Sequence, residues 1–339
     1  MVRAKWTCIL DEQRVKRSSH ALAVIGSNAY IYGGEIKPRE PVDSDVDVVS
    51  LDEVQKNAHL VSKITASSSG PSPRVGVLST VVNGQLYIFS GRGGIAMSPI
   101  EENGSLWVFD PLGKQWSRVA PKDGSLPYPQ GRSYYALTSD GHNTLFLHAG
   151  CPEKGRLRDL WSFQIADQTW KRLADAPEPE RGGPSIAYAD GKLYRMNGFD
   201  GKTEQGGSLD IYHIADDTWT TVPYHADGRS GPTARSVSCL VPITISDKPV
   251  LVTLFGESDP SNLGHQGAGK MLDDIWIFHL DTSAWTKVDI HGPNRPAARG
   301  WFDADALHSS PSPKVVIHGG LAESNERLGD LWTLEFDDD

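Results

Sequence analysis

Short runs of alternating apolar and polar residues, separated by turn residues, recur along the whole chain. The unit that starts at Arg74 reads RVGVLSTVVNGQLYIFSGRGG and continues as GSLWVFDPLGKQWSRV. It contains two apolar runs around an Asn-Gly pair, an aromatic run ending in Asp, and a final run with tryptophan. Runs of this length joined by such turns are typical of β-hairpins. Each unit therefore predicts four short β-strands.

Six such units follow one another, each beginning at an arginine. These arginines are Arg17, Arg74, Arg132, Arg181, Arg235 and Arg299, and successive ones lie 57, 58, 49, 54 and 64 residues apart. A repeat of about 50 residues with four strands is typical of kelch repeats, which form the blades of β-propellers. The sequence predicts an all-β fold, a six-bladed kelch-type β-propeller that occupies residues 1–339 as a single domain.

The chain ends predict how the ring closes. The sixth unit stops at LWTLEF and lacks the last strand with tryptophan that ends the other units. Residues 5–10, which include WTCIL, have the form of that missing strand. We therefore expect the N-terminal strand to complete blade six, which would also cover two sheet edges that are otherwise prone to pair with other chains.

Composition limits the partners and the compartment. The 339 residues carry a formal net charge of -10, with 3 cysteines and no apolar run approaching the length of a membrane span. An acidic chain without a broad basic field indicates neither a nucleic-acid nor a membrane partner. Three scattered cysteines predict no disulfide framework, and the first residues do not resemble a signal peptide. We expect a cytoplasmic protein that is a monomer or a weak homodimer.

The repeat also predicts where a site would lie. The start of the first strand and the end of the second share one face of a propeller, so the six arginines and the loops after the glycines should surround one mouth. The longest of these loops are residues 35–43, 92–102 and 257–272. Arginines gathered there would attract a small anionic molecule. Alternatively, each arginine serves its own blade by hydrogen bonding to strand carbonyls.

Several segments resemble the plant specifier proteins, the nitrile-specifier, epithiospecifier and thiocyanate-forming proteins with their kelch relatives. The resemblance rests on these segments: YGGEIKPREPVD, PSPRVG, GRSYYAL, ERGGPSIAYADGKLYRMNGFDG, FGESDPSNLGHQGAGKMLDDIW and RGWFDA. Members of that family direct the breakdown of an unstable sulfated aglucone, released by a thioglucosidase, to nitriles, epithionitriles or thiocyanates, with ferrous iron. The resemblance therefore implies an Fe(II)-dependent, lyase-like activity on a glucosinolate aglucone.

The resemblance also implies site residues. It assigns Glu257 and His265 to the metal, Arg74 and Arg132 to the anionic substrate, and Trp301 to the substrate pocket. We also predict that Glu35, at the start of the first long loop, binds substrate. In the family's Glu-x3-Asp-x3-His pattern this chain has Ser261 in place of the aspartate. Asp259 is the nearest carboxylate that could replace it as a metal ligand. Two carboxylates and one imidazole suit ferrous iron and tolerate manganese or zinc. Alternatively, Glu257 and Asp259 only order a polar loop.

Three functions stay open on the sequence alone. The first is the metal-dependent lyase just described. The second is an enzyme that modifies another small metabolite in a biosynthetic pathway, with or without a metal, which the Ser261 departure favours. The third is a non-catalytic kelch scaffold for a protein partner, although the blades use nearly all of the chain. A copper radical oxidase is disfavoured because no Cys–Tyr pair with clustered histidines can be assembled from the sequence.

Overall fold

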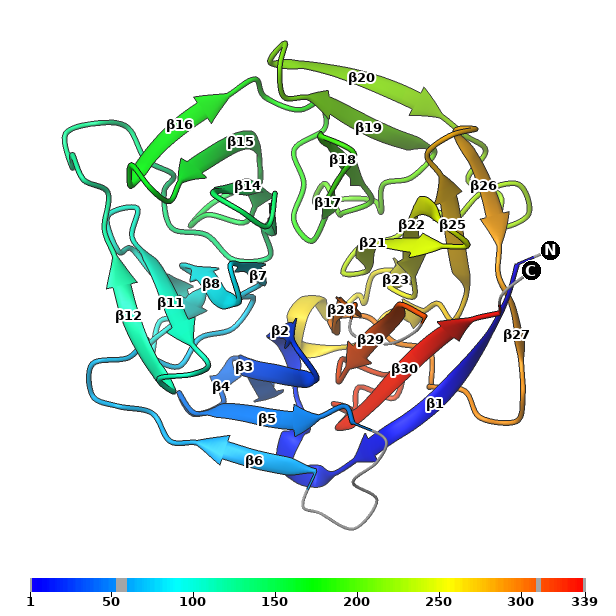
Figure 1. Cartoon of the computed structure of the whole chain (residues 1–339), viewed down its shortest axis with the longest axis horizontal. Helices are drawn as coiled ribbons and strands as arrows, with labels where there is room; N and C mark the ends of the chain where they lie inside the picture. The colour runs from blue at the N-terminus through cyan, green and yellow to red at the C-terminus, as the bar shows by residue number, and fades with distance from the viewer. Residues whose placement is uncertain (1, 53–59, 309–311, 338–339) are drawn as a thin grey trace.

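Six β-sheets surround a central channel as the blades of a propeller (Figure 1). The computed structural model describes residues 2–52, 60–308 and 312–337. In blades one to five the main strands run from the channel to the rim in chain order and pair antiparallel, whereas in blade six the N-terminal strand lies outside the last strand of the chain. This confirms the predicted six-bladed kelch-type propeller.

The strands of the first three blades are as follows. Blade one contains β2 (Ser18–Ile25), β3 (Asn28–Lys37), β4 (Glu40–Pro41), β5 (Val46–Ser50) and β6 (Val61–Ile64). Blade two contains β7 (Ser79–Val82), β8 (Gln85–Phe89), β11 (Leu106–Asp110) and β12 (Gln115–Val119), with the short pair β9 (Arg92–Gly93) and β10 (Ser98–Pro99) in its loop. Blade three contains β13 (Ala136–Ser139), β14 (Thr144–Gly150), β15 (Leu157–Gln164) and β16 (Thr169–Leu173).

The remaining blades repeat this order. Blade four contains β17 (Ser185–Ala189), β18 (Lys192–Met196), β19 (Ser208–His213) and β20 (Thr218–Pro223). Blade five contains β21 (Cys239–Ile245), β22 (Lys248–Leu254), β25 (Ile275–His279) and β26 (Ala284–Lys287), with the pair β23 (Glu257–Asp259) and β24 (Lys270–Met271) and the 3-10 helix η2 (Gly264–Gln266) in its loop. Blade six contains β28 (Asp303–Leu307), β29 (Lys314–His318), β30 (Asp330–Phe336) and β1 (Arg3–Asp11), with β27 (Asp289–His291) outside β1; the 3-10 helix η1 (Gln13–Val15) follows β1.

The N-terminal strand closes the ring as predicted. β1 pairs antiparallel with β30, so that Trp6 lies opposite Leu334 (Figure 1). Its outer edge pairs in parallel with β27, which follows blade five. Trp6 is buried and its ring stacks on Phe255 of blade five at 5.8 Å between centroids. The first strand of the chain therefore fixes blade six both to its own sheet and to its neighbour.

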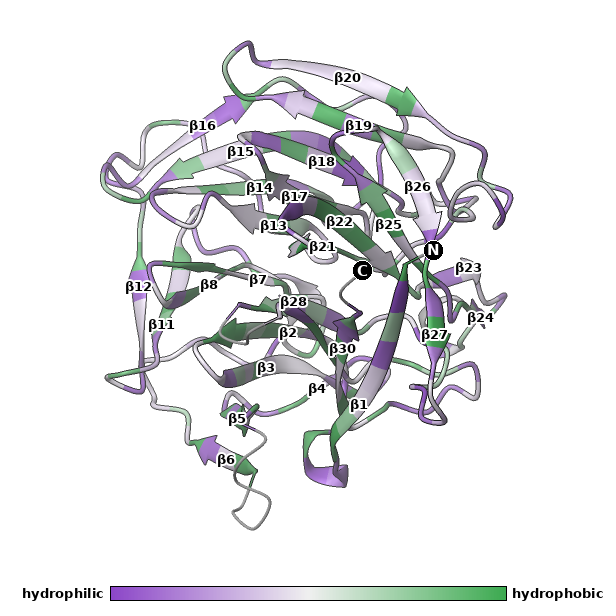
Figure 2. Cartoon of the chain, turned by 45° about the vertical axis from the view of Figure 1, so that its right-hand side comes forward, coloured by the Kyte–Doolittle hydropathy of each residue, from purple (hydrophilic) through white to green (hydrophobic). Residues whose placement is uncertain are grey.

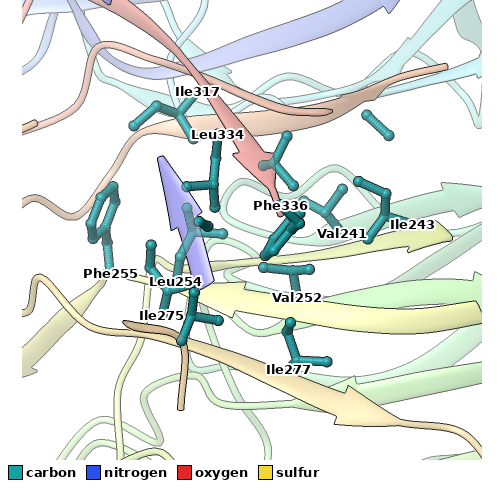
Figure 3. Close-up of a cluster of buried hydrophobic side chains, with 14 of the residues drawn as sticks. Val241, Ile243, Val252, Leu254, Phe255, Ile275, Ile277, Ile317, Leu334 and Phe336 are labelled. Carbon is teal, nitrogen blue, oxygen red and sulfur yellow. The ribbon is translucent and has the colours of Figure 1, made fainter. Parts of the chain in front are cut away.

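The hydrophobic core lies between neighbouring blades. Alternation along the strands gives them mixed hydrophobic and hydrophilic segments (Figure 2). One cluster joins blades five and six, where Val252 and Leu254 face Leu334 and Phe336 (Figure 3). A tryptophan of a fourth strand also contacts the neighbouring blade. The Nε1 of Trp170 in blade three donates to the carbonyl of Gly104 in blade two, 2.7 Å away.

A closed ring of six backbone hydrogen bonds joins the blades around the channel. In each repeat the second residue after the arginine has a φ between 45° and 66°, and its N–H donates to the same residue of a neighbouring blade over 2.7–3.0 Å. These residues are Ser19, Gly76, Tyr134, Gly183, Val237 and Trp301. Non-glycine residues rarely adopt a positive φ, and the ring holds four of them there. We call these six residues the neck ring.

The glycine at the end of each second strand permits the next inter-blade bond. Its N–H donates over 2.8–2.9 Å to the carbonyl of the arginine that starts the following blade. Its φ lies between 88° and 104°, where an L side chain is strained. At Gly34 a Cβ atom would also stand 2.6 Å from the carbonyl oxygen of Ser18. The repeated glycine in the sequence is therefore explained by blade-to-blade contact.

The repeat arginines are buried inside their blades. Each guanidinium donates to a carbonyl at the end of the second strand, and in five blades it also forms an ion pair with a carboxylate of the same blade. The pairs are Arg17–Asp47, Arg74–Glu102, Arg132–Asp159, Arg235–Asp274 and Arg299–Asp330. Asp159, Asp274 and Asp330 therefore contact the repeat arginine of their own blade. In the described part of the chain, no helix is both long and apolar enough to span a bilayer.

A pair of buried histidines joins blade six to blade one. His318 Nδ1 and His20 Nε2 lie 2.9 Å apart, and neither ring has a further hydrogen-bond partner. Burial is the main cause that places the pKa of each imidazole well below its usual value; the partner imidazole and Arg17 add to the effect at His20, and Arg17 and Arg299 at His318. Both histidines are therefore neutral in the folded protein.

We expect acid to weaken the fold through this pair. Because the pKa of each imidazole is lower in the folded protein than in the unfolded chain, the unfolded chain binds protons at higher pH. The contribution of the two histidines to the free energy of unfolding is therefore present above pH 6.5 and is lost as the pH falls below it. Between pH 7.5 and 5.5 the loss should be roughly 1–2 kcal/mol for each histidine. Urea unfolding at the two pH values measures it. The His318→Gln variant should lose part of this pH dependence, whereas His142→Gln, at an exposed position, should keep it; equal pH dependence in all three proteins would contradict the assignment.

Candidate functional site

A pocket of about 300 Å³ lies at the mouth of the channel, where the ends of blades three to six meet. Its walls come from the loops after the second strands and from the neck ring. We call it the mouth pocket and define it by Tyr134, Arg156, Phe199, Glu257, Asn262 and Trp301 among its lining residues. Of the three long loops singled out in the sequence, the loop over residues 257–272 is the one that reaches this pocket.

A second cavity of about 480 Å³ occupies the channel beyond the neck ring. It is lined by the first strands of the blades, and it shares Tyr134, Gly183, Val237 and Trp301 with the mouth pocket. The rings of Tyr134 and Trp301 come from opposite blades and meet edge to face, with centroids 5.2 Å apart. These two aromatic side chains therefore form the floor of the mouth pocket.

Arg156 supplies the cation of the mouth pocket. It lies at the start of blade three's third strand, and its guanidinium carbon stands 4.9 Å from the centroid of the Phe199 ring. Among the described residues it forms neither an ion pair nor a hydrogen bond, and its Nε atom is buried without a partner. Stacking on an aromatic face orients a guanidinium while its N–H groups stay available. Arg156 can therefore receive an anionic group.

Two glutamates lie near this cation. Burial raises the pKa of Glu204 to about 8, although Ser236 and Arg156 oppose the shift and Glu257 adds to it. Burial likewise raises the pKa of Glu257 to about 7, against a hydrogen bond of 2.8 Å that its carboxylate accepts from the Gly269 N–H. Glu204 is therefore largely protonated at neutral pH. Hydrogen bonds from its own turn, with a smaller contribution from Arg156, lower the pKa of Asp200, so Asp200 is the ionised carboxylate near Arg156, although the two form no ion pair among the described residues.

Arg74 and Arg132, which the resemblance assigned to the substrate, do not reach the mouth pocket. Arg74 is 0% exposed and pairs with Glu102, while Arg132 is 1% exposed and forms two hydrogen bonds to Asp159. Each also donates to carbonyls of its own blade. This corrects the expected orientation, because a buried guanidinium needs such partners and turns into the blade to find them.

Glu35 is also committed elsewhere. It is buried and pairs with Arg327 of blade six at 2.9 Å, and its second oxygen accepts a hydrogen bond from the backbone N–H of Arg39. It lines neither cavity. The expectation that Glu35 contacts substrate is corrected in the same way: its carboxylate ties blade one to blade six.

The blade-five loop contributes one of its predicted ligands to the pocket. Glu257 lines the mouth pocket, whereas Asp259 is exposed and does not. The side chain of His265 lies outside the described residues. Among the described side chains, no group of three or more His, Cys, Asp and Glu residues stands close enough to hold a metal ion. The described residues therefore do not complete a metal site, and the predicted ligand set of Glu257, Asp259 and His265 stays a prediction.

Three residues of the mouth pocket could not be identified from the sequence. Trp301 and Glu257 were singled out and do line the pocket, but Arg156, Tyr134 and Phe199 were not assigned to it. Arg156 stands outside the repeat pattern, in a loop that follows the second strand. That position alone does not identify a pocket cation, because Arg327, another arginine outside the repeat pattern in such a loop, pairs with Glu35.

Comparison with known proteins agrees with the kelch fold. Residues 19–256 match the family model described as the KLHDC2/KLHL20/DRC7 Kelch-repeats domain. A Thlaspi arvense protein named N-(sulfonatooxy)prop-2-enimidothioate sulfolyase is 27% identical over 93% of this chain and 91% of its own length. Human Host cell factor 2 is 24% identical over 75% of this chain and 32% of its own length. The solved structure of YjhT covers 95% of both chains with a TM-score of 0.68 and 15% identity, which supports the fold alone.

Proposed function

Since this chain belongs to the kelch-repeat family whose model matches residues 19–256, we propose that it is a specifier-type kelch propeller with lyase-like activity on a small anionic substrate. The observation that carries the proposal is the guanidinium of Arg156, which forms no ion pair among the described residues, in a pocket floored by Tyr134 and Trp301. The similar Thlaspi arvense protein is named for a sulfonatooxy substrate and a sulfolyase reaction. We propose a sulfated, sulfur-containing substrate such as a glucosinolate aglucone.

Arg156 would hold the sulfate group. A guanidinium matches two sulfate oxygens with two parallel N–H donors, and Phe199 keeps its plane fixed. As the bond to the sulfate breaks, negative charge grows on the departing oxygen, and a fixed cation stabilises that charge more in the transition state than in the ground state. Arg156 would thereby favour loss of sulfate over release of the intact substrate.

The aromatic floor would hold the apolar part of the substrate. Tyr134 and Trp301 have a positive φ imposed by the neck ring, so their positions do not depend on bound substrate. Their rings close the pocket toward the channel cavity and reduce the access of water from that side. A fixed apolar floor beneath a single cation orients a molecule that has one charged and one apolar end.

Ferrous iron is the cofactor that the resemblance implies. Glu257 is the buried carboxyl that faces the mouth pocket, and the described residues alone do not complete its ligand set. We therefore assign no step to a metal. When bound, iron would supply a Lewis acid for the sulfur of the substrate.

The product mixture tests the proposed function. We expect the protein to raise the nitrile fraction formed from aglucone that a thioglucosidase releases, and the Glu257→Ala variant to lower that fraction because a polar pocket wall is lost. Reactions with and without added ferrous iron measure whether the metal contributes. A product mixture that stays unchanged for both proteins under both conditions would contradict the proposed function.

A further inference from the structure

Blade four lacks the arginine–carboxylate pair that the other five blades contain. Arg181 is 3% exposed, and the one hydrogen bond of its side chain among the described residues runs from Nη1 to the carbonyl of Asn197, 3.0 Å away. In β19, Ser208 precedes Leu209, which pairs with Val222. Asp159 of blade three stands at the same place, before Leu160, which pairs with Leu173. A serine has therefore replaced the carboxylate that Arg181 would meet.

A second arginine takes the remaining partners. Arg195 is 0% exposed and pairs with Asp210 at 2.6 Å. Its Nη2 donates to the carbonyl of Pro179, 3.2 Å away. In the other five blades the carbonyl two residues before the repeat arginine accepts from the Nε of that arginine. In blade four that carbonyl belongs to Pro179 and is committed to Arg195, so Arg181 loses it as well.

The result is a buried guanidinium that forms no ion pair among the described residues. Asp210, which acts electrostatically on Arg181, is paired with Arg195, and Arg181 Nε has no hydrogen-bond partner in the described part of the chain. The hydroxyl of Tyr224, which interacts electrostatically with Arg181, also lacks one. Burial and then Arg195 lower the pKa of Arg181 to about 9, which still leaves it charged at neutral pH. An uncompensated buried charge is costly, and proteins avoid it by pairing.

We propose that blade four binds a small monovalent inorganic anion, chloride, beside Arg181 at the place of the missing carboxylate. Serine is shorter than aspartate and carries no charge, so Ser208 does not supply the counter-charge that the carboxylate supplies in blades three, five and six. The N–H of Arg181 Nε and the hydroxyl of Tyr224 are the two donors that would hold the ion. This site is separate from the mouth pocket, and it does not rest on the proposed enzyme activity.

Unfolding in chloride and in gluconate tests the site. At constant ionic strength, replacing sodium gluconate with sodium chloride should stabilise the wild-type protein, and chloride at 100 times its Kd should lower the unfolding equilibrium constant roughly 100-fold. Gluconate is the control because it is too large for a carboxylate-sized site. Tyr224→Phe should weaken the chloride effect by removing one donor. Crystals soaked in bromide should show an anomalous peak beside Arg181.

The Ser208→Asp variant makes the test specific. It restores the carboxylate of blades three, five and six, so it should unfold independently of chloride and be at least as stable in gluconate as the wild type is in chloride. Thr218→Asp adds the same charge at an exposed position of the same blade and should keep the chloride dependence. A wild-type protein that unfolds identically in chloride and gluconate would overturn the proposal, as would a Ser208→Asp variant that keeps the full chloride dependence.

Discussion

The Arg156→Gln variant is expected to lose about 100-fold in kcat/KM for sulfate elimination, within the range measured when one charge-stabilising donor is removed from an active site. Glutamine keeps a polar side chain of similar reach but carries no charge. Arg156 forms no ion pair among the described residues, so its replacement should leave the unfolding transition unchanged. Steady-state kinetics with thioglucosidase-released aglucone, together with urea unfolding, measure both quantities.

Two further variants separate charge from geometry. Arg156→Lys keeps the charge but loses the planar pair of donors and the stacking on Phe199, so its activity should fall between those of the wild type and Arg156→Gln. Lys154→Gln removes a positive charge from the same loop at an exposed position outside the pocket, and should retain activity within a factor of about 3. Equal losses in Lys154→Gln and Arg156→Gln would show that only the overall charge of the mouth matters.

The fold could be predicted because every blade repeats the same physical requirement. The neck ring needs a residue with positive φ two positions after each arginine, and the second strand needs a glycine where the next blade approaches. The second constraint leaves a glycine in each repeat, whereas the residue in the neck ring differs from blade to blade. The closure by β1 could be predicted for the same reason, since the missing strand of blade six had a known sequence form that residues 5–10 supply.

The site was harder to predict because its residues occur once. Arg74 and Arg132 were conspicuous in the sequence because they repeat, and a residue that repeats in every blade serves the blade. Arg156 belongs to no repeat. Whether its guanidinium can bind a substrate depends on whether a carboxylate pairs with it in the folded structure. The sequence shows spacing along the chain, whereas the availability of a guanidinium depends on contacts between blades three, four and five.

We expect Asp159→Ala to lower the stability by about 3–5 kcal/mol, the usual cost of leaving one member of a buried ion pair alone. Asp159 accepts two hydrogen bonds from Arg132 and a third from Trp161 Nε1 at 2.8 Å. Removal of the carboxylate leaves the guanidinium of Arg132, a residue that is 1% exposed, without its ion-pair partner. Chemical denaturation monitored by tryptophan fluorescence and by far-ultraviolet circular dichroism measures the loss and shows whether both signals report one transition.

An exposed ion pair in the same blade provides the matched control. Arg172 and Asp175 lie 3.0 Å apart with side chains 58% and 31% exposed, so Asp175→Ala should cost between 0 and about 1 kcal/mol. If Arg132 instead held substrate, Arg132→Lys would abolish activity while the fold stayed intact. The buried geometry predicts the reverse: Arg132→Lys destabilises the blade because a single ammonium cannot replace two guanidinium donors, yet the folded fraction retains its activity. A fully stable but inactive Arg132→Lys protein would return this arginine to the active site.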